Sequence, residues 1–83
     1  MSTTTYPSKE ILKVELQKVC SSEKLIERLS SNFGGQTISC NHRIAQVAAF
    51  RALEYDQDAK PSDAEACSKV LCSYVDEHGC KTN

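Results

Sequence analysis

Residues 61–79, PSDAEACSKVLCSYVDEHG, carry the clearest helical signal in the chain and set the expected fold class. Apolar residues recur here at alternating spacings of three and four, which is the repeat of one helix face. These residues are Ala64, Cys67, Leu71 and Tyr74, and His78 continues the spacing. The S-x-x-E sequence of Ser62–Glu65 after Pro61 predicts the start of the helix, and Gly79 predicts its end.

Three further helices are predicted before this one, each opened by a capping residue. Ser8 opens the first helix, and Ser21 or Ser22 opens the second, which a Gly-Gly pair at 34–35 ends. Thr37 or Ser39 opens the third helix, which runs to about residue 55 and is apolar around most of its surface, so we expect it to be central. No alternation typical of a strand competes with these patterns.

The helical patterns predict an all-α fold, a small bundle of three to four helices. It forms a single domain over residues 1–83, in which residues 1–7 and 81–83 are expected to be flexible. The predicted core residues are Leu12, Leu16, Leu25, Leu29, Phe33, Ile44, Ala48, Leu71 and Tyr74.

The composition is that of a small globular chain, and it excludes several classes of protein. The chain has 83 residues, of which 40% are hydrophobic and 25% are charged. No apolar run approaches the length of about 18 residues that a membrane span needs. The five cysteines form an odd set without a secretion signal, so we expect reduced thiols and a cytoplasmic protein. The net charge of −1 does not favour nonspecific binding to nucleic acid.

No catalytic motif is present, so the sequence predicts a protein that is not an enzyme and needs no cofactor. A small zinc-stabilised domain is one alternative, because Cys40, His42, His78 and Cys80 form two close pairs of soft ligands. Each pair has one intervening residue, whereas zinc pairs usually have two to four. We therefore expect no metal.

A helix-turn-helix DNA-binding regulator is the other alternative, since two predicted helices flank a glycine-containing turn. Its base-reading residues would be Asn41, Arg43 and Gln46 near the start of the third helix, with Arg51 further along. The near-neutral charge argues against this function, and we regard a nucleic-acid partner as unlikely on this ground.

Four large apolar residues fall away from the core stripes of their helices, and they point to a binding surface. Ile11 and Val14 lie off the stripe of the first helix, and Val47 and Phe50 lie off that of the third. A monomer rarely leaves such side chains exposed together. The sequence therefore predicts a small non-catalytic protein-binding or regulatory module that occupies a partner protein's surface, an inhibitor for example, and that forms a homodimer through these faces.

Overall fold

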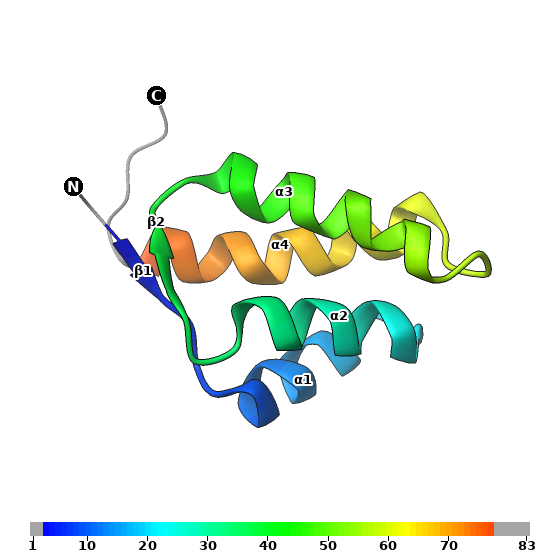
Figure 1. The fold of residues 1–83 in the computed structure, drawn as a ribbon, viewed down its shortest axis with the longest axis horizontal. Helices are drawn as coiled ribbons and strands as arrows, with labels where there is room; N and C mark the ends of the chain where they lie inside the picture. The colour runs from blue at the N-terminus through cyan, green and yellow to red at the C-terminus, as the bar shows by residue number, and fades with distance from the viewer. Residues whose placement is uncertain (1–2, 78–83) are drawn as a thin grey trace.

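The computed structural model describes residues 3–77, and in this range the chain forms four α-helices, a short 3-10 helix and one pair of strands (Figure 1). In chain order these are β1 (Thr3–Thr5), α1 (Lys9–Gln17), α2 (Glu23–Phe33), β2 (Thr37–Ser39), α3 (His42–Arg51), η1 (Ala52–Tyr55) and α4 (Pro61–Glu77). Successive helices run in opposite directions along the long axis, and the strands lie at one end. The prediction of a small helical bundle is confirmed. The predicted helix end at Gly79 and the segment 81–83 lie outside the described residues.

Helices α1 and α2 begin where the sequence predicts, because each has a serine N-cap. The Ser8 hydroxyl accepts a first-turn backbone N–H at 3.4 Å, and the Ser22 hydroxyl accepts another at 3.2 Å. Helix α2 ends at the predicted glycine pair, where the Gly34 N–H donates to the Ser30 carbonyl at 2.8 Å. Gly35 follows with a φ of 71°, which glycine adopts without steric cost.

The β1–β2 pair is the main element that the sequence analysis missed. The strands are antiparallel, with Thr4 opposite Ile38. Thr4 is completely buried and Tyr6 is 4% exposed, although both belong to the segment expected to be flexible. The Tyr6 ring packs against Phe33, with 5.1 Å between ring centroids. Within this segment, Thr4 and Tyr6 are therefore part of the packed structure.

Helix α3 begins later than predicted. Thr37 and Ser39 belong to β2 and cap no helix, so this part of the prediction is wrong. Asn41 is the N-cap, and its side-chain oxygen accepts the Arg43 backbone N–H at 2.8 Å. The helix then tightens into η1, which ends at Tyr55, the predicted end of the helical stretch.

Helix α4 begins one residue before the predicted capping serine. Pro61 is its first residue, a position that suits proline because the missing N–H would have no partner there. The Asp63 carboxylate accepts the Lys60 backbone N–H at 3.0 Å. The predicted capping box of Ser62 and Glu65 is therefore wrong, since Ser62 already lies inside the helix.

The core lies between the four helices, and most of the predicted core residues occupy it. Six of the nine are at most 3% exposed: Leu12, Leu16, Leu25, Leu29, Phe33 and Leu71. Ile44 was predicted wrongly, since it is 37% exposed, and Ala48 and Tyr74 are only partly buried. Helix α3 is not central. It packs mainly on the longer helix α4 through small side chains, Ala45 and Ala49, which allow close approach and leave Ile44 outside.

None of the helices in residues 3–77 is both long enough and apolar enough to cross a membrane.

Candidate protein-binding face

The outer face of α3 follows from the alanines on its inner face. Ala45 and Ala49 are completely buried against the rest of the bundle. At 100° per residue, Val47 and Phe50 then lie on the opposite side of the helix. Their exposed fractions are 41% and 45%, which is high for large apolar side chains. These are two of the four residues that the sequence analysis singled out for partner binding.

A shallow groove runs beside these two side chains, between α3 and the first turns of α4. Its volume is about 640 Å³. Its walls are Gln46, Val47, Phe50 and Arg51 from α3, Glu54 from η1, and Glu65 and Ser68 from α4. The face thus combines two projecting apolar side chains with a hollow next to them, an arrangement that can receive a similar projection from another surface.

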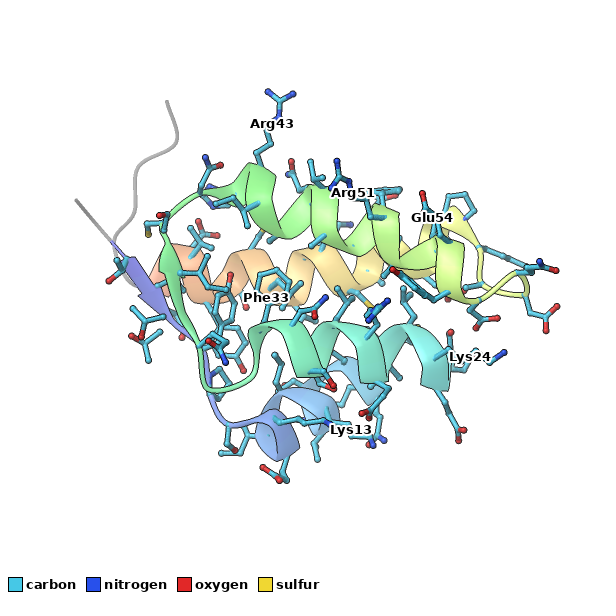
Figure 2. The ribbon with its side chains drawn as sticks, viewed as in Figure 1. Lys13, Lys24, Phe33, Arg43, Arg51 and Glu54 are labelled. Carbon is cyan, nitrogen blue, oxygen red and sulfur yellow. The ribbon has the colours of Figure 1, made fainter. Side chains whose placement is uncertain are left out.

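Charged side chains of both signs surround the apolar pair. Figure 2 shows Arg43 projecting away from the helices at the start of α3, with Arg51 and Glu54 toward its other end. Within residues 3–77, none of these three forms an ion pair. Their charges are therefore free to meet a partner's charges.

The second predicted pair, Ile11 and Val14, is also exposed but lies on a separate face. Their exposed fractions are 56% and 53%. Helices α1 and α3 lie along opposite edges of the molecule in Figure 1, so the structure does not bring the two pairs together. Two nearby basic residues on α1 are already paired within the chain. Lys9 and Lys13 both bind Glu27, at 2.7 and 3.3 Å, and their hydrogen bonds lower the pKa of Glu27 to about 2.

The residues considered for DNA reading do not lie on a helix-turn-helix. Asn41 caps α3, while Arg43, Gln46 and Arg51 are exposed on that helix. The connection from α2 to α3 covers residues 34–41 and contains strand β2, whereas a helix-turn-helix has a turn of about three or four residues. The two helices are also close to antiparallel in Figure 1. This geometry does not favour a DNA-reading helix.

The candidate zinc ligands are engaged in other contacts where the structure describes them. Cys40 is disulfide-bonded, and the Thr4 hydroxyl lies 3.1 Å from its Sγ. The expectation of fully reduced thiols is therefore wrong at Cys40, and the cytoplasmic assignment loses part of its basis. No group of three or more metal-binding side chains occurs in residues 3–77. His78 and Cys80 lie outside the described residues.

His42 connects the start of α3 to the end of α4. Its Nε2 lies 2.6 Å from the Asp76 carboxylate, and its Nδ1 is buried with no hydrogen-bond partner among residues 3–77. The Cys72 thiol donates to the His42 carbonyl at 3.8 Å. These contacts hold the two helix ends together.

The three other cysteines within residues 3–77, Cys20, Cys67 and Cys72, are free thiols. Burial, and then contact with Cys20, raise the pKa of Cys67 to about 12. Burial, and then the Asp76 charge, raise the pKa of Cys72. Both thiols are therefore protonated at neutral pH, which is the unreactive form of cysteine.

The sequence analysis missed three residues of the α3 groove. Glu54 could have been found, since it continues the spacing of residues 43, 47 and 50 along one helix face. Glu65 and Ser68 could not have been found, because only the packing of α4 against α3 brings them there. The chain matches no protein-family model, no curated protein and no solved structure.

Proposed function

We propose that the chain is a small non-catalytic protein-binding module that acts by occupying the surface of a partner protein through the outer face of α3. The observation that carries this proposal is the exposure of Val47 and Phe50 beside the α3–α4 groove. Contiguous exposed apolar side chains with a charged surround are typical of protein-binding sites.

The titratable groups support binding over catalysis. A nucleophilic cysteine needs a lowered pKa, and the pKa values of Cys67 and Cys72 are raised instead. The carboxylate of Asp76 forms a hydrogen bond with the His42 ring, with 2.6 Å between Oδ1 and Nε2. These groups therefore serve the fold in this proposal.

Phe50 is expected to supply much of the binding free energy. With 45% of its surface exposed, it leaves about 90 Å² in water, taking about 200 Å² for a phenylalanine side chain. Covering that area would stabilise a complex by about 2 kcal/mol. Replacing Phe50 by a charged residue removes this gain and adds a desolvation cost, so the affinity should fall by at least about tenfold.

The test compares Phe50→Asp with Ile11→Asp, a matched apolar-to-acid change on the opposite edge of the molecule. Immobilised wild-type protein and the Ile11→Asp variant should capture one dominant protein from the source cells, and Phe50→Asp should not. Equal capture by both variants, or by neither, contradicts the proposal. Salt-sensitive binding to duplex DNA that Arg43→Glu abolishes would replace it with the DNA-binding alternative.

A further inference from the structure

We propose that the α3 face receives a second copy of this chain, with the two α3 helices packed antiparallel about a two-fold axis between Val47 and Phe50. This inference rests on the proposed function, because it names the partner of that same face.

Four residues on this face follow one another at spacings of four, three and four: Arg43, Val47, Phe50 and Glu54. This spacing keeps Arg43, Val47 and Phe50 on one side of α3. Glu54 belongs to the 3-10 helix η1, and the groove places it beside Val47 and Phe50. The last three line the same groove. The centre of the face is therefore apolar, with the cation of Arg43 before it and the anion of Glu54 after it. Arg51, which also lines the groove, lies between Phe50 and Glu54 in sequence.

A two-fold axis at the centre of this face makes the surface complementary to itself. Arg43 lies as many residues before the centre as Glu54 lies after it, and Val47 and Phe50 are placed in the same way. In an antiparallel pair, Arg43 therefore faces Glu54 of the second copy, and Val47 faces Phe50. A parallel pair would place like charges opposite each other, which is unfavourable. The charge order thus selects the antiparallel arrangement.

The structure leaves both the charges and the space available for this arrangement. Arg43 and Glu54 form no ion pair within residues 3–77. The groove of about 640 Å³ beside Phe50 gives room for the Phe50 ring of the second copy. Two exposed charges on α1, those of Lys9 and Lys13, differ in this respect, because both are already paired with Glu27. The self-complementary face is therefore on α3.

The expected dimer is weak. One antiparallel pair of short helices buries much less surface area than the roughly 1,600 Å² of a standard stable interface. We expect a dissociation constant in the micromolar range, and weaker pairing at high salt because the ion pairs at its rim are screened.

The test is a charge-reversal cycle measured by sedimentation equilibrium over a concentration series. In Arg43→Glu or Glu54→Arg alone, like charges face each other at both ends of the dimer, so self-association should weaken by about tenfold or more. In the double variant the charges are exchanged, and self-association should return to within about threefold of wild type. Lys24→Glu, an exposed charge reversal on α2, is the control and should leave the dimer unchanged.

The variants are chosen to keep the fold. A glutamate in the first turn of α3 and an arginine near the end of η1 both carry the charge that the helix dipole favours at that end. Circular dichroism checks that each variant keeps its helix content. A double variant no better than the single variants overturns the antiparallel arrangement. A wild-type monomer at all concentrations overturns self-pairing. If that monomer still captures a partner that Phe50→Asp loses, the proposed function stands and only this inference fails.

Discussion

Gly34 caps the end of α2 against the backbone at the start of α1, and replacing it by alanine should destabilise the fold severely. A Cβ atom at this position would lie 2.5 Å from both the Lys9 Cα and the Ser30 carbonyl oxygen, and 2.9 Å from the Lys9 nitrogen. Ordinary contact begins near 3.4 Å. The obstructing atoms belong to the backbone, so no side-chain rotation can relieve the clash. The start of α1 must move away by roughly 1 Å, and the last turn of α2 must distort as well.

The expected loss of unfolding free energy is about 3 kcal/mol or more, the upper end of the range for overpacked sites. A chain of this size has a total stability of about 4–12 kcal/mol, so the loss is a large part of it. The melting temperature should fall by about 12–24 °C. Urea denaturation followed by circular dichroism measures the loss, and a variant too unstable to fold agrees with it.

The neighbouring glycine provides the control. Gly35 has a positive φ of 71° but nothing within 4 Å of an added Cβ. The Gly35→Ala variant should therefore lose only about 1–2 kcal/mol, the conformational cost of the left-handed region. If Gly34→Ala is as stable as Gly35→Ala, the close approach of the Lys9 backbone does not restrict residue 34 to glycine, and the reasoning fails.

Two further predictions concern the core. Leu71→Ala should lower the unfolding free energy by about 2–5 kcal/mol because Leu71 is completely buried. Val70→Ala, at a partly buried position, should lower it clearly less. Equal losses in urea denaturation would contradict the assigned orientation of α4. The free energy of unfolding should also fall from about pH 9 to 12. Burial raises the pKa of the Cys67 thiol and of the Tyr6 phenol to about 12. The unfolded chain therefore loses these protons at lower pH than the folded chain does, which favours unfolding. Cys67→Ala should flatten the pH dependence of the unfolding free energy over this range, and an unchanged slope would exclude Cys67 as a source.

The helix positions could be predicted well where a local signal decides them. Ser8 and Ser22 cap α1 and α2 because a serine hydroxyl can satisfy a free N–H of the first turn whatever the rest of the chain does. The exposed apolar side chains Val47 and Phe50 were also found from sequence, since helical periodicity places them opposite Ala45 and Ala49. Whether these side chains bind a partner is not a local property, and it stays a prediction.

Other features depend on contacts between distant parts of the chain. The three threonines of β1 show no alternation between apolar and polar residues, so nothing local marks them as a strand. Ile44 was placed in the core because it is large and apolar, but the close packing of α3 on α4 selects Ala45 and Ala49 for the contact. The groove likewise needs Glu65, which belongs to another helix.

The pairing of β1 with β2 has a consequence for the order in which the chain folds. Thr5 and Thr37 pair although 32 residues separate them in sequence, and the enclosed loop contains both α1 and α2. A two-stranded ribbon is marginal by itself, and closing so long a loop costs conformational entropy. The ribbon can therefore form only after α1 and α2 have packed and brought its strands together. Strand β1, which precedes both helices in the chain, is then among the last elements to reach its final position.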